Sequence, residues 1–352
     1  AWLDATGKVA PLREKLLAWV EQHGTTPEAG FVYQAWLDAT GEAAPLREKL
    51  LAWVAQHGTT PKAQFVYKAW LDATGEAAPL REKLLAWVEQ HGTTPEAKFV
   101  YKAWLDAKGE VAPLREKLLA WVAQHGTTPD ARFVYQAWLD SGHPFKEIQQ
   151  ACEEWLKHNW QREDAVYLIK NLSGIPDLPL PSLARILSWV GLFPTNEDAI
   201  YRLSRASRFF GRHLDKPGFL RLVVKSSQAA IAALVARAQV TPGQKDAVII
   251  LMGNLATKEF ARNPYWRDTL QLFRLCLRHR LLGVNGFSVS WASFILFLHD
   301  ALKEGVLDPA LDAEAIRRAH DLVAQTAPPE HYCRLLETGY LPPPPSLTPG
   351  AG

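Results

Sequence analysis

The chain contains few of the residues that mark disulfide-rich, metal-binding or membrane-spanning proteins. Its three cysteines, Cys152, Cys276 and Cys333, are far apart and show no CxxC spacing, so neither a disulfide framework nor a zinc site is expected. The chain also has no large excess of either charge, because 39 basic and 37 acidic residues leave a net charge of +2. The chain therefore lacks the excess of positive charge that a general polyanion binder needs.

Long apolar runs and catalytic motifs are missing as well. The most apolar stretch, residues 286–298, is too short and too interrupted by serine to span a bilayer, which takes about 20 apolar residues, so we expect a buried helix there and no membrane. No HExxH motif, nucleophile elbow or GxxxxGK[ST] phosphate loop occurs, and His331 beside Cys333 is not the geometry of a catalytic dyad. These absences predict a non-enzymatic, cytoplasmic protein with no cofactor and no metal.

The chain has instead a 34-residue segment written four times. The first copy reads AWLDATGKVAPLREKLLAWVEQHGTTPEAGFVYQ, and near-identical copies begin at Ala35, Ala69 and Ala103. A unit this short cannot bury its apolar face alone and must stack on its neighbours. The sequence therefore predicts an all-α fold, a right-handed α-solenoid of helix-turn-helix repeats with about eight helical pairs.

The repeat becomes less regular along the chain. We expect four near-identical repeats over residues 1–136 and a degenerate fifth repeat over residues 137–174. Divergent helical repeats and a C-terminal cap are expected over residues 175–340. The proline-rich residues 341–352 are predicted to be a disordered tail.

Each copy contains the signals for two helices. The first helix is expected to begin at Pro11 and to end at Gly24. The second is expected to use Thr26 as a hydroxyl cap, to place Pro27 at its first position and to end at Gly41. These signals predict one helical hairpin per repeat.

The second helix is apolar around most of its circumference. On a helical wheel only Gly30, Gln34 and Asp38 form a polar seam, with Phe31 and Leu37 on its edges. A helix with one narrow polar seam is expected to lie between neighbouring helices. We therefore predict that the second helices line the concave face and that this seam is exposed to solvent.

The recurring aromatic and histidine residues are predicted to be structural. Trp19, Tyr33, Trp36 and their equivalents recur at helical spacing, which favours the core over ligand stacking. His23 and its equivalents precede a glycine at a helix end, where a side-chain donor can meet terminal carbonyls, so metal ligation is not expected.

The clearest candidate site lies where otherwise identical copies differ, at three positions near the start of the second helix. These positions are Glu28, Lys62, Glu96 and Asp130; Gly30, Gln64, Lys98 and Arg132; and Gln34, Lys68, Lys102 and Gln136. Solvated residues can drift freely, but Arg13, Glu14 and Lys15 are also expected to be exposed and do not vary. The competing hypothesis is that the variable residues select a protein or peptide partner.

A second candidate is a basic stripe in the divergent region. Arg202, Arg205, Arg208 and Arg212 follow one another at spacings of three or four residues. Such a stripe could bind an anion such as phosphate, or it could be a solvated helix face. The same two interpretations hold for Arg278 and Arg280.

The repeat resembles two known families. Its length, with Pro27 before a helix and Gly41 at a turn, resembles tetratricopeptide repeats, which implies a helical solenoid that binds proteins or peptides. The junction from His23 to Glu28 resembles pentatricopeptide repeats, which implies single-stranded RNA binding with Tyr33 and Glu28 at the base-reading positions. A tyrosine that is constant in every copy cannot discriminate among bases, so nucleic acid is not the expected partner.

Near-identical helical repeats followed by divergent ones also resemble the C-terminal sensor arrays of bacterial NLR-like or STAND defence proteins. This resemblance implies that the chain is the ligand-sensing part of a larger protein, with an effector and an NTPase domain N-terminal to it. A structural scaffold remains the third interpretation of the array.

Overall fold

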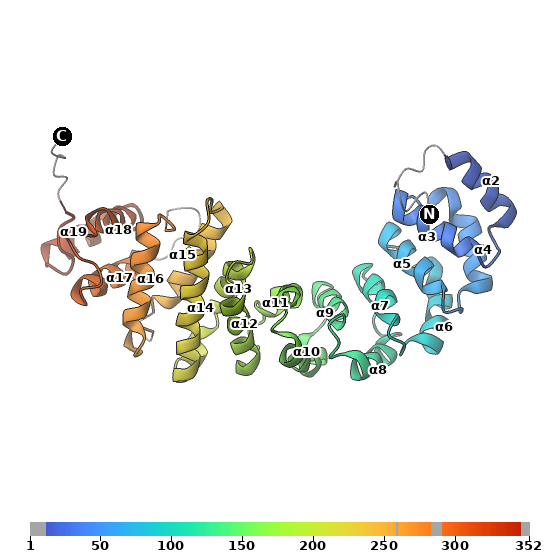
Figure 1. Ribbon diagram of the computed structural model, residues 1–352, viewed down its shortest axis with the longest axis horizontal. Coiled ribbons are helices and arrows are strands. Elements are labelled where there is room, and N and C mark those ends of the chain that lie inside the picture. Colours follow the sequence, from blue (N-terminus) through green and yellow to red (C-terminus); the bar gives the residue numbers. More distant parts are fainter. Residues whose placement is uncertain (1–11, 258–259, 283–290, 346–352) are drawn as a thin grey trace. The chain divides into compact units, whose positions relative to one another are not determined.

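The computed structural model describes residues 12–257, 260–282 and 291–345, and these residues form 18 α-helices (Figure 1). Successive helices pack as hairpins, and each also packs against the helix two places further along the chain. The predicted all-α α-solenoid of helix-turn-helix repeats is thus confirmed. The chain divides into two compact units, Ala1–Asn159 (unit 1) and Trp160–Gly352 (unit 2), and the division falls inside the predicted fifth repeat.

The described residues of unit 1, from residue 12 onward, form four helical hairpins and one further helix. The first helices of the repeats are α2 (Arg13–His23), α4 (Arg47–His57), α6 (Arg81–His91), α8 (Arg115–His125) and α10 (Phe145–Asn159). The second helices are α3 (Ala29–Thr40), α5 (Ala63–Thr74), α7 (Ala97–Asp106) and α9 (Ala131–Asp140). Short 3-10 turns, η2 (Ala44–Leu46) and η3 (Ala78–Leu80), precede α4 and α6.

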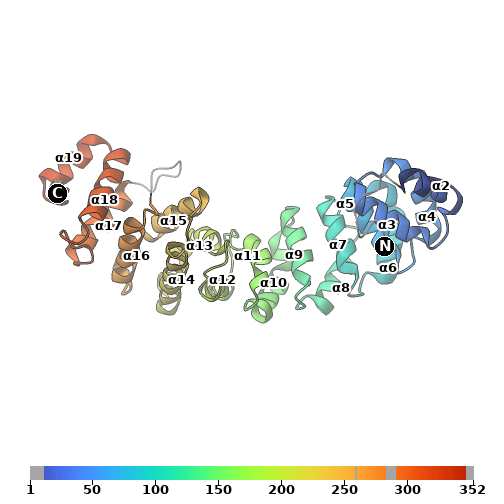
Figure 2. The same cartoon turned by 45° about the horizontal axis from the view of Figure 1, so that its top comes forward.

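The helices of unit 1 form two layers, one of first helices and one of second helices (Figure 1 and Figure 2). Successive second helices lie closest together, α3 against α5, α5 against α7 and α7 against α9, whereas successive first helices approach each other less. Buried alanines such as Ala63, Ala69 and Ala97 allow this close approach. The second helices therefore form the inner, concave side of unit 1, as the sequence predicts.

The helix boundaries confirm the glycine signals but not the threonine cap. Gly41 ends α3 in the left-handed conformation, with φ at 67°. The second helix begins only at Ala29, and no side chain caps it. Thr26 Oγ1 instead donates to the carbonyl of His23, 2.9 Å away, at the end of the first helix. The predicted N-cap is wrong because the hydroxyl satisfies the preceding helix.

Eight tryptophans of unit 1 are buried in its core, and the indole nitrogen of each is bonded to a backbone carbonyl: Trp36, Trp53, Trp70, Trp87, Trp104, Trp121, Trp138 and Trp155. Trp36 Nε1 donates to the Glu42 carbonyl at 2.7 Å, within the turn that follows its helix. Trp53 Nε1 donates to the Thr26 carbonyl of the preceding repeat at 2.8 Å. The inter-repeat bond recurs in unit 1 at Trp87, Trp121 and Trp155. The predicted core role is confirmed for these tryptophans, whereas Trp19 is half-buried.

A tyrosine and a glycine join the two helices of each hairpin. Tyr67 Oη donates to the Gly58 carbonyl at 2.7 Å, and the same bond recurs at Tyr33, Tyr101 and Tyr135. A Cβ atom on Gly58 would lie 2.6 Å from Tyr67 Oη, so the close approach requires a glycine. In the degenerate fifth repeat, Trp160 stands at the glycine position and Ile169 at the tyrosine position, so both partners of this bond are replaced together.

The histidines bind carbonyls, but in the neighbouring repeat. His91 Nε2 lies 2.9 Å from the Thr59 carbonyl, and His57 and His125 make the equivalent bond. Because a carbonyl only accepts, Nε2 is the donor. Asn159 occupies the same position in the fifth repeat and donates its amide to the Thr127 carbonyl at 2.9 Å. The position therefore requires a side-chain donor.

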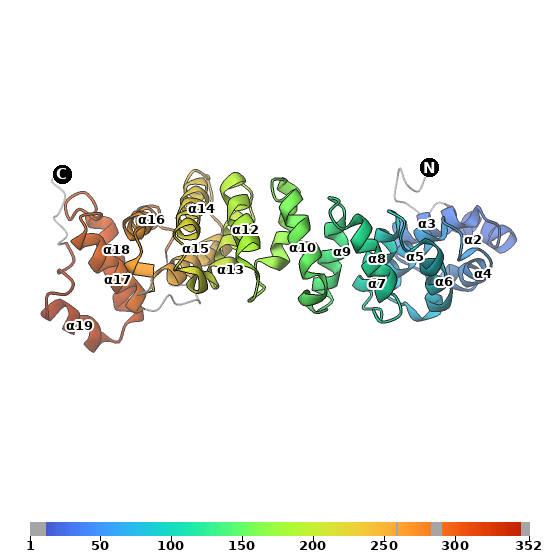
Figure 3. The ribbon, with the colours of Figure 1, turned by 90° about the horizontal axis from the view of Figure 1, so that it is seen from below.

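The helices of unit 2 vary more in length than those of unit 1, and α12 packs against α14 and α13 against α15 (Figure 3). Its helices are α11 (Val166–Leu172), α12 (Leu180–Leu192), α13 (Ala199–Ser207), α14 (Pro217–Val235), α15 (Pro242–Leu255), α16 (Trp266–Arg278), α17 (Trp291–Lys303), α18 (Ala313–Thr326) and α19 (Pro329–Glu337). Its 3-10 turns are η4 (Glu163–Ala165), η5 (Phe210–His213) and η6 (Phe260–Arg262).

Three sequence predictions fall partly outside the described residues. The first helix, expected to begin at Pro11, is seen as α2 from Arg13 onward, and Pro11 itself lies outside the described residues. The expected buried helix over residues 286–298 is seen from Trp291 onward as α17, in which Phe297 and Leu298 are buried. Residues 283–290 and residues 346–352 of the proline-rich tail lie outside the described part of the chain.

One helix of the described residues, α14, is long and apolar enough to cross a membrane by length and composition. Half of its most apolar window, 50%, is buried inside the protein. A buried core helix meets the same criteria, so α14 is weak evidence for a membrane span.

Candidate binding face

The structure gives the three variable positions different environments. Glu28, Lys62 and Glu96 are exposed, and Asp130 is half-buried. Residues of the second position are mostly covered, since Gly30, Gln64 and Arg132 are buried and Lys98 is half-buried. The third position, Gln34, Lys68, Lys102 and Gln136, is half-buried throughout.

The expectation that Gly30 opens to solvent is wrong. A Cβ atom on Gly30 would lie 2.7 Å from Trp53 Cζ2, because the indole of the next repeat packs directly against this glycine. Gln64 is only 7% exposed at the equivalent place. A helical wheel gives the angle of a residue around its own helix but not which neighbour covers that angle.

Variable residues also meet one another across the junction between repeats. Lys98 Nζ lies 2.5 Å from Asp130 Oδ2, so the Gly30 position of one repeat contacts the Glu28 position of the next. The Lys98 side chain is only 19% exposed. Pairing between repeats is therefore a third explanation of the variation, beside free drift and partner selection.

The invariant polar residues have structural partners too. Arg47 forms an ion pair with Glu76 at 2.9 Å and stacks over Trp70, whose ring centroid lies 5.2 Å from the guanidinium carbon. Lys49 forms an ion pair with Glu21 at 3.1 Å. These residues belong to the Arg13 and Lys15 positions, so their invariance is not evidence that the variable positions are selected for binding.

The exposed strip of the second helices runs through phenylalanines. Phe31, Phe65 and Phe99 are 54%, 38% and 39% exposed, and Phe133 is half-buried at the same position. These four residues are called the aromatic column here. Within the described residues of unit 1, the exposed large hydrophobic side chains all belong to this column. The solvent-facing seam therefore passes through Phe31, Gln34 and Asp38, and it does not include Gly30.

A sequence signal for this column was present but missed. The aromatic residue recurs every 34 residues beyond the regular repeats, as Tyr167 and Tyr201, although most of the surrounding sequence has changed. Tyr167 is 53% exposed in unit 2, so burial does not account for its aromatic ring. An aromatic residue retained at an exposed repeat position points to contact with another molecule.

Charged side chains beside the column are paired along their own helices. Lys68 Nζ lies 2.8 Å from Asp72 Oδ2, and Lys102 makes the equivalent contact with Asp106. The face thus carries both signs of charge around exposed aromatic rings. Such a mixed surface suits a protein ligand better than a polyanion.

Only part of the basic stripe, Arg202, Arg205, Arg208 and Arg212, is exposed and not paired with a carboxylate of the described residues. Arg202 is buried and forms an ion pair with Asp198 on its own helix. Arg212 donates to Asp177 Oδ1 at 2.9 Å. The anion-binding prediction therefore depends on Arg205 and Arg208, both of which are exposed.

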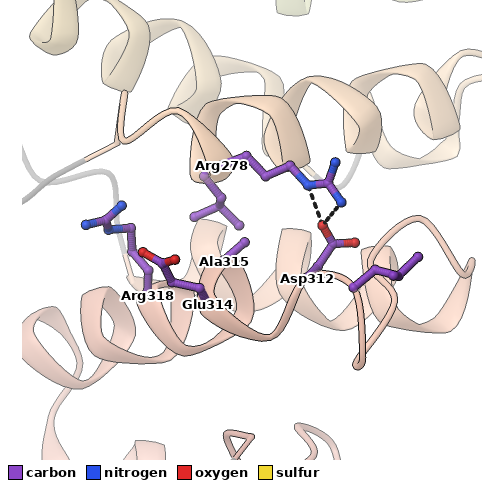
Figure 4. Close-up of a pocket in the computed structure, with 7 residues that line it drawn as sticks. Arg278, Asp312, Glu314, Ala315 and Arg318 are labelled. Atoms are coloured by element: carbon purple, nitrogen blue, oxygen red, sulfur yellow. Dashed lines mark hydrogen bonds and ion pairs between the residues drawn. The ribbon is translucent and has the colours of Figure 1, made fainter. Parts of the chain in front are cut away.

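The second basic segment is also neutralised, at a small pocket of about 150 Å³ between α16 and α18 (Figure 4). Asp312 is buried, and it pairs with Arg278 and with Arg274 Nη2, 3.0 Å away. Burial opposes its charge, but the bonds from the two guanidinium groups hold the pKa of Asp312 below its ordinary value. Arg280 pairs with Glu314 at 3.0 Å. This site stabilises unit 2 internally.

Other candidate chemistries can be located in the described part of the chain. Tyr33 and its equivalents are fully buried, so they cannot read bases. Burial raises the pKa of the Cys276 thiol to about 12 and also raises that of Cys152, which keeps both protonated. Within the described residues, no group of three or more His, Cys, Asp or Glu side chains could hold a metal ion.

Comparison of the chain with protein families, with curated proteins and with solved structures found no match.

Proposed function

We propose that the protein recognises a protein or peptide ligand along the concave face of its second helices. The supporting observation is the aromatic column, in which Phe31, Phe65 and Phe99 expose large apolar rings at one repeat position. An exposed ring is normally tolerated singly, whereas a regular series on one concave face provides anchor sites for a partner.

The repeat geometry limits the form of the ligand. Packed helices lie about 8–10 Å apart, so successive rings of the column are separated by roughly that distance. A peptide in the polyproline II conformation advances about 3.1 Å per residue and returns the same face every three residues, so about three ligand residues correspond to one repeat. The proposed ligand is an extended segment with an apolar side chain at roughly every third residue.

Charge argues against the RNA alternative. The face pairs Lys68 with Asp72, and the whole chain carries a net charge of only +2. A backbone of phosphates needs an excess of cations, and its binding weakens steeply with salt. Strong, salt-sensitive binding of single-stranded RNA to the purified chain would therefore contradict the proposal.

The test is selection of peptides from a random display library on the full chain. Affinities of the selected peptides are then measured by fluorescence anisotropy for the chain and for Phe31→Ala and Phe99→Ala. Loss of a buried aromatic contact at an interface hot spot costs about 2 kcal/mol or more, a reduction in affinity of about thirtyfold.

The control is Leu311→Ala, since Leu311 is 77% exposed but belongs to unit 2 and not to the aromatic column. Thermal melts of all variants check that the fold is retained. Selected peptides that bind the Phe31→Ala and Phe99→Ala variants as tightly as the parent chain would show that the column is not the binding face.

The wider role we propose is that of the sensing module in a bacterial defence or signalling protein. It is supported by the array architecture and by the resemblance described above. The test compares phage infection of cells that produce the full-length protein with that of cells producing the Phe31→Ala and Phe99→Ala double variant. Equal protection by both proteins would contradict a sensing role for this face.

A further inference from the structure

Three of the four rings in the aromatic column have a cation from the protein beside them. Lys62 Nζ lies 5.3 Å from the Phe31 centroid, Lys98 Nζ 4.9 Å from that of Phe99, and the Arg132 guanidinium 4.3 Å from that of Phe133. Such distances allow a cation–π interaction. In the described part of the chain, no lysine or arginine stands over Phe65.

The repeat sequence explains this exception. The cation comes either from the residue before the phenylalanine, as with Lys98, or from the start of the second helix in the next repeat, as with Lys62. For Phe65 these two positions hold Gln64 and Glu96. One is uncharged and the other is acidic, so neither can supply a cation.

The same junction presents a carboxylate without a cation. One repeat further on, Lys98 Nζ lies 2.5 Å from Asp130 Oδ2 while it also stands beside Phe99. Glu96 occupies the Asp130 position beside Phe65, is exposed, and forms no ion pair with a described residue. Phe99 and Asp130 thus hold the Lys98 ammonium group between them, whereas the equivalent Phe65 and Glu96, one repeat earlier, have no cation of the described residues beside them.

We infer that this junction binds a cationic side chain, Arg or Lys, of the ligand. This inference rests on the proposed function, because the cation arrives as part of the peptide on the concave face. The ligand cation lies over the exposed ring of Phe65 and against the exposed Glu96 carboxylate, beside the buried Gln64 side chain, which occupies the position of Lys98. The contacts of Lys98 with Phe99 and Asp130 therefore show, within the protein, the arrangement that we propose for the bound ligand cation.

The experiment uses the peptides selected on the full chain. We expect Arg or Lys to be enriched at one peptide position and expect the citrulline analogue, which keeps the shape of arginine without its charge, to bind more weakly. A cation–π contact and an exposed ion pair together account for about a five- to thirtyfold loss of affinity. Glu96→Gln and Gln64→Lys should each weaken the arginine peptide and leave the citrulline peptide nearly unchanged.

Gln64→Lys is the sharpest variant because it recreates an arrangement that the protein already uses. It places a lysine before Phe65 and opposite Glu96, as Lys98 stands before Phe99 and opposite Asp130. The matched control is Gln56→Lys, which adds the same charge to the same unit at an exposed position of the first helix α4, off the concave face. We expect this control to leave the preference for arginine over citrulline unchanged.

The outcomes separate the two proposals. Peptides that need Phe31 and Phe99 but bind equally well as arginine and citrulline forms, or that are unaffected by Gln64→Lys, would overturn the cation site and keep the peptide-binding function. Peptides insensitive to Phe31→Ala and Phe99→Ala, or selection of none, would overturn both.

Discussion

Tyr67→Phe is the most direct test of how each hairpin is held together. The Tyr67 side chain is fully buried, and its hydroxyl donates to the Gly58 carbonyl at 2.7 Å. No backbone N–H of the described residues donates to that carbonyl. Removing the hydroxyl leaves a buried acceptor without a partner, which costs about 1–3 kcal/mol in free energy of unfolding.

Gly58→Ala tests the same contact from the other side. The added Cβ would lie 2.6 Å from Tyr67 Oη and 2.4 Å from the Val54 carbonyl oxygen. Tyr67→Phe relieves the first of these clashes but not the second. The double variant should therefore be more stable than the sum of the single changes predicts, by about 0.5–3 kcal/mol.

The assay is urea unfolding followed by tryptophan fluorescence, with hydrogen exchange to locate the loss, because a repeat array can open locally. The control is Tyr167→Phe, which removes a hydroxyl from a side chain that is 53% exposed and should change stability by less than about 0.5 kcal/mol. The reasoning is refuted if Tyr67→Phe behaves like this control and if Gly58→Ala is equally damaging with and without the Tyr67 hydroxyl.

Three further predictions concern stability. His91→Ala should lose about 0.5–1.5 kcal/mol by thermal melting, whereas His91→Asn should lose much less because Asn159 makes the same bond to the preceding repeat. Lys108→Gly should raise the free energy of unfolding by up to about 1 kcal/mol in urea, since Lys108 has a φ of 54° that glycine adopts without strain. Burial raises the pKa of Tyr101 above its ordinary value of 10.0, so the folded state keeps a proton that the unfolded chain releases at high pH. The free energy of unfolding should therefore be constant below about pH 10 and should fall above it, by up to about 1.4 kcal/mol per pH unit for each such tyrosine. Urea midpoints measured across that pH range would check this.

Local sequence signals were enough to predict the architecture. The 34-residue period, the apolar spacing and the glycines predicted two helices per repeat, and α4 indeed ends at His57, directly before Gly58. The buried tryptophans of unit 1 were correctly assigned to the core, because large side chains that recur on the apolar face of a helix mark the face that packs against its neighbours. The threonine cap was wrong because the Thr26 hydroxyl donates backward to the His23 carbonyl, which also accepts from the Thr26 backbone N–H.

The candidate site depended on contacts between repeats. The sequence by itself determined the hairpin, its period and the set of residues that differ between copies, since these follow from patterns along one helix. Only the tertiary structure decided that Gly30 lies under Trp53, that Phe31 is exposed, and that Lys98 contacts Asp130. The physical reason is that exposure and ion pairing depend on which neighbour covers each face of a helix. That neighbour comes from the next repeat, about 30 residues away in sequence and adjacent in space.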